Sequence, residues 1–256
     1  MLSCATAAAQ DRSREAATDA IISGTGGAAA FTQRAERPPE VAGEHRLQVG
    51  PVAINARNNG PWDAPDVDGI TVVRLAAAAD SEFQVLAPFG TTLGWLRFSP
   101  DGAWISYVVI RDTGVEQWVA EIASGIPRPL TSASLNAAWG EPCRWLADSS
   151  GMLCRFLRSG RGSPPEAADA LIEYYFTSQL GTVLLATGRR SDLGAPGLFV
   201  HAEPVPDSDR LLVVRLAEST GADAAARRIP RSVEILDPDG NLVRRLADLP
   251  AGGGAR

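Results

Sequence analysis

The stretch GWLRFSPDGAWISYVV, residues 94–109, decides the fold because it is one copy of an internal repeat. Two further segments align with it in chain order: PCRWLADSSGMLCRFL at 142–157 and HAEPVPDSDRLLVVRL at 201–216. In each copy one run enters a turn rich in Ser, Pro, Asp or Gly, and a mainly apolar run leaves it. Two such runs around a short turn are typical of a β-hairpin.

Each copy continues with a second recurring element, a strand that ends at a glycine turn and is followed by a short outer strand. The glycine-ended strands are QWVAEIASG (117–125), GTVLLATG (181–188) and SVEILDPDG (232–240), and the outer strands are RPLT (128–131), RSDLG (190–194) and VRRLAD (243–248). The turn glycines are 63 and 52 residues apart. Each unit is then a four-stranded antiparallel meander. One such sheet cannot bury both faces by itself, whereas sheets stacked around an axis can.

The repeat therefore predicts an all-β fold, a partial β-propeller of about four antiparallel blades over residues 41–250. Three blades are clear, and residues 45–90 supply a divergent fourth. Residues 1–40, rich in Ala and Gly, are predicted to be a flexible tail with one short helix at 11–22, and residues 251–256 a flexible end. Nine strands are expected at 51–57, 70–75, 84–87, 103–111, 116–122, 152–157, 182–186, 211–216 and 232–236. An incomplete ring leaves an open edge through which copies can associate.

Composition excludes several partners. The formal net charge is -6 and the pI is about 5.0, so the chain lacks the basic face that nucleic acid or an anionic membrane requires. We interpret the arginine pairs 189–190, 227–228 and 244–245 as solvated positions. No apolar run approaches the ~18 residues of a membrane helix. The opening MLSCATAAAQD resembles the last part of a secretory signal, so a periplasmic or secreted protein and a cytoplasmic one both stay open.

The three cysteines, Cys4, Cys143 and Cys154, have no spacing typical of a zinc site, and we expect neither a metal nor a cofactor. Cys143 and Cys154 flank a turn at 148–151. A hairpin centred on that turn places Trp145 opposite Cys154 and Cys143 diagonally across from it. A bulge at the turn would bring the two sulfurs opposite each other. The sequence predicts that they lie close together, and a disulfide would depend on export.

Several segments together resemble the propeller domain of the S9 prolyl oligopeptidase family, in particular its glutamyl endopeptidase-like branch from bacteria and chloroplasts. They are SPDGAWISYVVIRDTGVEQWVAEIASGIPRPLT (99–131), LNAAWGEPCRWLADSSGMLCR (135–155), GRGSPP (160–165), RLQVGPVAINARNNGP (46–61), EYYFTSQL (173–180) and IPRSVEILDPDGNLVRRLADLP (229–250). The resemblance covers about residues 36–250. The insertion SPPEAADALI is shorter than is usual in the family.

The resemblance implies a function for the chain. In the family the propeller filters peptide-sized substrates above a companion α/β-hydrolase domain, which bears a GxSxG-type elbow, an Asp and a His. This sequence has no GxSxG and stops at AGGGAR, so we expect no catalytic residue in it. Ser23 and Ser150 are expected in turns, and His45 and His201 in structural positions. The implied role is substrate gating and peptide binding. The alternative is a free-standing propeller that acts as an interaction scaffold, and the cleavage preference stays open.

Other motifs are interpreted as structural. The glycine cluster ISGTGGAA (22–29) lacks the flanking strand and helix of a dinucleotide site, and DPDGN (237–241) lacks the ligand spacing of a calcium loop. Five tryptophans at 95, 104, 118, 139 and 145 favour packing between blades over a ligand platform, and Trp118 is predicted to be core. Residues 141–145 and the loop 160–165 lie between repeat elements, where binding loops often occur.

Overall fold

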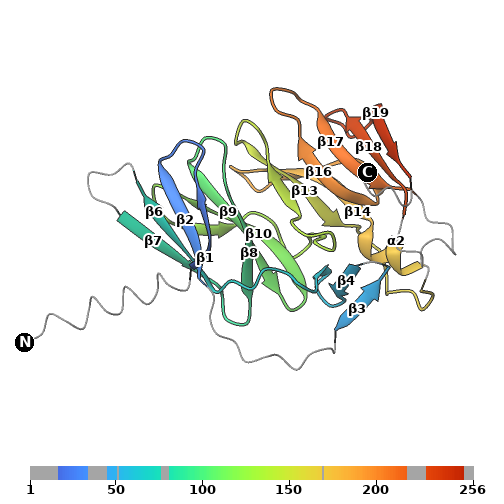
Figure 1. Cartoon of the computed structure of the whole chain (residues 1–256), viewed down its shortest axis with the longest axis horizontal. Coiled ribbons are helices and arrows are strands. Elements are labelled where there is room, and N and C mark those ends of the chain that lie inside the picture. The colour runs from blue at the N-terminus through green and yellow to red at the C-terminus, as the bar shows by residue number, and fades with distance from the viewer. Residues whose placement is uncertain are drawn as a thin grey trace, which may run out of the picture.

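The computed structural model describes residues 17–33, 45–50, 52–75, 81–168, 170–217 and 229–250. Within these residues, four four-stranded antiparallel sheets lie next to one another in chain order, with a three-stranded sheet inserted in the sequence of the first and one short helix in that of the third (Figure 1). The all-β, propeller-type fold predicted from the repeat is confirmed. No helix in these ranges is long and apolar enough to span a bilayer.

Blade 1 contains two strands that the sequence did not predict. Its strand order is β1 (Ala17–Ile22), β2 (Ala28–Gln33), β6 (Gly69–Arg74) and β7 (Ser81–Leu86). The predicted tail is therefore wrong over residues 17–33, and the predicted helix is wrong over 17–22. Packing explains the strand, because every second residue of β2, starting with Ala28, is buried. The sequence does not show this alternation, since alanine occupies both buried and half-buried positions. The rest of the predicted tail and the predicted flexible end at 251–256 lie outside the described residues, as does the arginine pair 227–228.

The other three blades follow the predicted repeat. Blade 2 consists of β8 (Thr92–Phe98), β9 (Trp104–Arg111), β10 (Gly114–Glu121) and β11 (Pro127–Pro129). Blade 3 consists of β12 (Cys143–Trp145), β13 (Gly151–Leu157), β14 (Ser178–Leu184) and β15 (Arg190–Gly197). Blade 4 consists of β16 (Phe199–Pro204), β17 (Leu211–Leu216), β18 (Arg231–Leu236) and β19 (Leu242–Leu249). Each blade is a meander whose neighbours in sequence are neighbours in the sheet.

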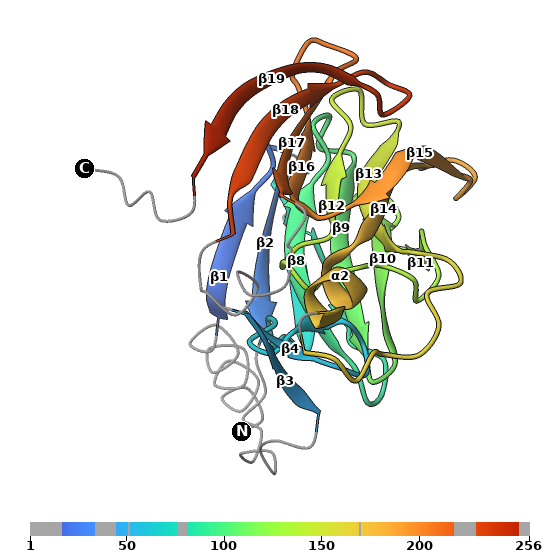
Figure 2. The same ribbon diagram turned by 90° about the vertical axis from the view of Figure 1, so that its right-hand side faces the viewer.

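The divergent blade predicted at residues 45–90 is wrong as one unit. Its first part forms a separate insert sheet of β3 (Arg46–Val49), β4 (Val52–Asn55) and β5 (Gly60–Pro61), and only β6 and β7 belong to blade 1. The insert sheet packs against α2 (Ala170–Phe176), which lies in the connection between β13 and β14 (Figure 2). Blade 1 is thus assembled from two segments that the insert separates.

The core lies between the blades. One apolar cluster joins blades 1 and 2, another joins blades 2 and 3, and a third joins blades 3 and 4. In β10, Val119 faces blade 3 and Ala120 faces blade 1, so burial on both faces of this strand is confirmed. The prediction that Trp118 is core is wrong, because this residue is only half-buried. It packs against the cluster of blades 1 and 2, and its indole Nε1 donates to Glu116 Oε2 at 2.8 Å. The other predicted packing tryptophans also lie in or against apolar clusters.

The turn glycines of the repeat contact the preceding blade. Gly125, Gly188 and Gly240 all have positive φ angles, of 71°, 68° and 85°. A Cβ built on Gly125 would lie 2.9 Å from Phe83 of blade 1, and one on Gly240 would lie 2.5 Å from the backbone N of Gly194 in blade 3. The glycines therefore allow both the turn and the close approach of one blade to the next.

Gly240→Ala should destabilise the protein more than Gly90→Ala does. Both glycines have positive φ, so both substitutions carry a penalty of about 1–2 kcal/mol. Only Gly240 faces backbone atoms of a neighbouring blade, and overpacking adds about 1–3 kcal/mol there. Urea unfolding of the two variants measures the difference. Equal losses of stability would show that the turn does not pack against blade 3 as described.

Candidate functional site

The first strands of the four blades line one cavity of about 490 Å³. β1 contacts β8, and β12 contacts β16, so these strands form the inner side of the blade array. We call this cavity the inner groove, and its wall is formed by Ile21, Ile22, Gly24, Leu96, Arg97, Phe98, Ser99, Pro100, Arg144, Trp145, Glu203 and Pro204. A volume in this range is typical of ligand pockets. The groove is therefore the place where all four blades can contact one ligand.

A shared carboxylate organises the charged part of the groove. Glu141 accepts from Arg97 Nε at 2.5 Å and Arg97 Nη2 at 2.8 Å, and it also pairs with Arg144. The side chains of Arg97 and Arg144 are 47% and 22% exposed, whereas Glu141 is only 12% exposed. The carboxylate is thus held beneath two arginines that reach the groove. Residues 141–145, expected to lie near a binding surface, do contribute to its wall.

A third arginine, Arg155, supports this wall from within the protein. It is buried and donates to the carbonyl oxygens of Gly140 and Glu141 before β12 and to those of Phe199 and Val200 in β16, over 2.7–3.2 Å. Burial, and then the nearby charge of Arg144, lower the pKa of Arg155 to about 10, so it stays charged at neutral pH. Arg155 therefore ties blade 3 to blade 4 through carbonyl groups instead of a carboxylate.

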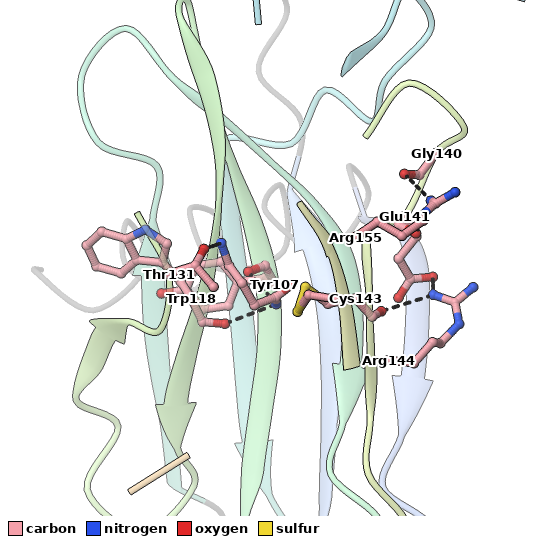
Figure 3. The surroundings of a disulfide bond; sticks show 10 residues. Tyr107, Trp118, Thr131, Gly140, Glu141, Cys143, Arg144 and Arg155 are labelled. Atoms are coloured by element: carbon pink, nitrogen blue, oxygen red, sulfur yellow. Dashed lines mark hydrogen bonds and ion pairs between the residues drawn. A yellow bond between two sulfur atoms is a disulfide. The ribbon is translucent and has the colours of Figure 1, made fainter. Parts of the chain in front are cut away.

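A disulfide lies beside the arginines. Cys143 and Cys154 form a directly opposed pair of β12 and β13 with Cα atoms 4.1 Å apart. Figure 3 shows Glu141, Arg144 and Arg155 on one side of this bond and Tyr107, Trp118 and Thr131 on the other. The predicted proximity is confirmed, but the predicted pairing of Trp145 with Cys154 is wrong, because Trp145 pairs with Met152. The turn spans residues 147–150 and is closed by Leu146 N donating to Gly151 O.

The histidines and serines considered as catalytic candidates lie apart from one another. His45 Nε2 is 3.3 Å from Arg57 Nη1, and His201 Nε2 is 3.1 Å from Glu203 Oε2 at the groove. Ser23 Oγ accepts from Ala28 N in the β1–β2 hairpin, and Ser150 bonds Asp148 in the β12–β13 hairpin. Contrary to expectation, Ser23 follows a strand, β1. The chain then continues into the strand β2 and not into a helix. Within the described ranges, no group of three or more His, Cys, Asp and Glu side chains could hold a metal.

The loop 160–165 belongs to a different part of the molecule. Arg161 donates to Asn59 Oδ1 at 2.8 Å, and its guanidinium lies 4.6 Å from the centre of the Tyr174 ring. Asn59 in turn donates to Asn136 and to Tyr175 O, both within 2.9 Å. This network joins the insert sheet, the blade 2–blade 3 connection and α2. The sequence reasoning missed it, although Asn before Gly is a common signal for the positive φ of 57° found at Asn59.

A larger cavity of about 840 Å³ lies at the insert sheet and blades 1 and 2. Its wall includes Trp62, Pro65, Phe89 and Asp112. Asp112 is already paired with Arg57 at 2.6 Å. Blades 3 and 4 do not reach this cavity, whereas the inner groove collects charged side chains from blades 2, 3 and 4. We therefore regard the inner groove as the candidate functional site.

Comparison with known proteins gives relatives of one kind. No protein-family model matches the chain. It is 28% identical to the probable chloroplastic glutamyl endopeptidase of Arabidopsis thaliana and 26% identical to that of Oryza sativa subsp. japonica, in each case across 64% of this chain and 21% of the relative. The chain thus spans about a fifth of the length of these curated relatives.

Solved structures share the fold at lower identity. The Pyrococcus horikoshii acylaminoacyl peptidase superposes with a TM-score of 0.53 at 11% identity, covering 91% of this chain and 32% of that one. A Mycobacterium tuberculosis puromycin-hydrolyzing peptidase gives a TM-score of 0.50 at 14% identity, covering 91% and 30%.

The blade order and these likenesses define a β-propeller fold that the chain shares with solved peptidase structures. The resemblance seen in the sequence is confirmed: the chain is similar to the N-terminal propeller region of glutamyl endopeptidase-like members of the prolyl oligopeptidase family.

Reduction of the Cys143–Cys154 disulfide should lower the free energy of unfolding by about 2–3 kcal/mol, because the bond closes a loop between residues separated by 11 positions. Urea unfolding with and without dithiothreitol measures this. The control is the double variant Cys143→Ser/Cys154→Ser, whose stability should not respond to the reductant. An unchanged unfolding midpoint for the reduced wild-type chain would contradict a stabilising role of the bond.

Proposed function

We propose that this chain is the substrate-gating and peptide-binding part of a prolyl oligopeptidase-type serine peptidase and acts with a companion hydrolase domain. The observation that carries the proposal is the inner groove, which draws wall residues from the first strand of every blade. Such a groove can accept an extended peptide and exclude folded chains, because its walls are fixed by blade packing. The curated relatives, named as endopeptidases, support a peptide as the ligand.

The groove supplies the contacts that peptide binding requires. Arg97, Arg144 and Glu203 provide charged groups, and Trp145 and Pro204 provide apolar surface. The indole of Trp145 is fixed because its Nε1 donates to Arg97 O at 3.4 Å. Pockets that combine apolar walls with a few placed polar groups are typical of specific ligand sites.

Ile22→Trp should weaken the binding of short peptides by about tenfold or more, a loss of about 1.4 kcal/mol. Ile22 lines the groove and is 70% exposed, so the larger side chain narrows the groove without entering the core. The control is Leu86→Trp, because Leu86 is 66% exposed on the outer strand of the same blade and lies away from the groove. Fluorescence anisotropy of labelled peptides on the 256-residue chain measures both variants. Equal affinities for the two variants would place peptide binding elsewhere.

Catalysis is proposed to reside in the companion domain. His201 is engaged by Glu203, His45 lies beside Arg57, and neither has a serine hydroxyl partner within the described residues. A serine nucleophile needs such a base within hydrogen-bond distance.

The purified chain should accordingly show no labelling by a fluorophosphonate probe and no hydrolysis of peptide or ester substrates. Intact-mass measurement after exposure to the probe tests this directly. A known serine hydrolase treated in parallel serves as the positive control. Stoichiometric labelling of one serine would overturn the assignment of catalysis to another domain.

The second candidate function is a free-standing propeller that acts as an interaction scaffold. It is favoured by the outer strand β19, along which Leu242, Val243, Leu246 and Leu249 are all exposed. Among the strands that the structure describes, β19 pairs only with β18, so in this part of the chain its other edge can accept a further strand, including one from a second copy. In the anisotropy experiment, a chain that associates with itself and binds no short peptide would favour this function over substrate gating.

A further inference from the structure

We propose that the cavity of about 840 Å³ beside the insert sheet is a second binding site, which takes an arginine or lysine side chain from an extended peptide segment. We call it the insert cavity, after the sheet that forms one of its walls. None of its wall residues lines the inner groove, so this inference stands apart from the function proposed for that groove.

The first argument is the placement of the exposed aromatic rings. Within the described residues, Trp62 and Phe89 are the only exposed aromatic side chains, and Phe89 is fully exposed. Both line the insert cavity, although Trp62 follows β5 and Phe89 lies in the connection between β7 and β8. Exposed apolar groups that gather at one place mark a binding surface. The face of an aromatic ring attracts guanidinium and ammonium groups, so these rings suit a cationic side chain.

The second argument is the charge of the wall. It holds the carboxylates of Asp66, Asp68 and Asp112 and one guanidinium, that of Arg111. Arg111 donates through Nε and Nη2 to the two carboxylate oxygens of Glu116, at 2.8 and 3.0 Å, so its charge is neutralised within the blade. In the described part of the chain the wall is therefore negative, and it favours a cationic ligand over an anionic one.

Asp112 is the carboxylate assigned to direct contact with the ligand. Its side chain is 62% exposed, and its Oδ2 pairs with Arg57 Nη2 at 2.6 Å. Oδ1 has no partner among the described residues, so it can accept a charge-assisted hydrogen bond from the ligand. Asp66 and Asp68 take part in interactions of their own within the protein, and they contribute through their charge. Arg57 and Glu116 stand outside the wall and carry opposite charges, so together they leave the cavity negative.

The third argument is that the walls are held in place before a ligand binds. Pro88 O accepts from Thr91 N at 3.0 Å and from Thr91 Oγ1 at 2.7 Å, so a closed turn presents Phe89. Trp62 N donates to Ala53 O at 3.0 Å, which fixes this residue to the insert sheet. A ligand therefore meets rings whose backbone is already fixed, and less conformational entropy is lost on binding.

The test measures the binding of labelled peptides of one length, with acetylated and amidated ends, to the complete chain at low salt. One peptide carries a central arginine, and its counterpart carries citrulline, which has nearly the same shape and no charge. A lysine peptide and its acetyllysine counterpart repeat the comparison. We expect each charged peptide to bind about tenfold or more tightly than its neutral counterpart. Asp112→Asn should remove most of this preference, and Phe89→Ala should weaken the binding of the charged peptides about threefold or more.

Matched controls make the same changes away from the insert cavity. Ile126→Ala truncates an apolar side chain that is 67% exposed between β10 and β11, and Asp209→Asn removes an exposed carboxylate that also pairs with an arginine. Both controls should keep the full preference, and so should Ile22→Trp, which narrows only the inner groove. Equal affinity of the charged and neutral peptides for the wild-type chain, or equal losses in Asp209→Asn and Asp112→Asn, would overturn the site. A preference lost in Ile22→Trp and kept in Asp112→Asn would overturn it too, by placing the cationic side chain in the inner groove.

Discussion

A four-stranded antiparallel sheet with apolar residues on both faces cannot be stable alone, and the whole structure depends on covering those faces with neighbouring blades. β9 shows the constraint most clearly, because Tyr107 packs toward blade 1 while Val108 packs toward blade 3. The same need brings the backbone turns of adjacent blades into contact, which only glycine permits at Gly240. Inter-blade packing, more than any single sheet, therefore holds the molecule together.

The same stacking creates the inner groove. Because each blade starts at its inner strand, the array brings four short segments together that are far apart in the sequence. The inner strand of blade 3 has only three residues, and Arg155 from the next strand supports its surroundings by binding carbonyl groups before β12 and in β16. A buried cation is costly to desolvate, and four carbonyl partners offset this. The groove wall and the stability of the blade 3–blade 4 contact are therefore linked.

The sequence predicted the strands that local patterns encode, and it missed the strands and side-chain pairs that depend on contacts between distant residues. The hairpin repeat located the strands of blades 2 to 4, and β17 spans the residues expected for it. β1 and β2 escaped because they are rich in alanine, which has a low β-propensity, and because blade 1 is completed by strands beyond the insert sheet. Of the groove, the tract 141–145 was anticipated, but the roles of Arg97 and Arg155 were not. Arg97 pairs with Glu141, 44 residues away, and Arg155 donates to the carbonyl oxygen of Phe199, also 44 residues away. No local sequence pattern encodes such pairs.

The position of each blade in the array also affects its stability. Blades 2 and 3 are covered by a neighbour on both faces, whereas within the described residues blades 1 and 4 are covered on one face only. In stacked repeat structures, units with fewer neighbours open at lower free energy. Arg97 and Arg144 lie on the doubly covered blades, while Ile22 and Pro204 lie on the end blades. The two arginines of the groove thus lie on its most stable blades, whereas Glu203 and the apolar residues Ile22 and Pro204 lie on blades that open at lower free energy.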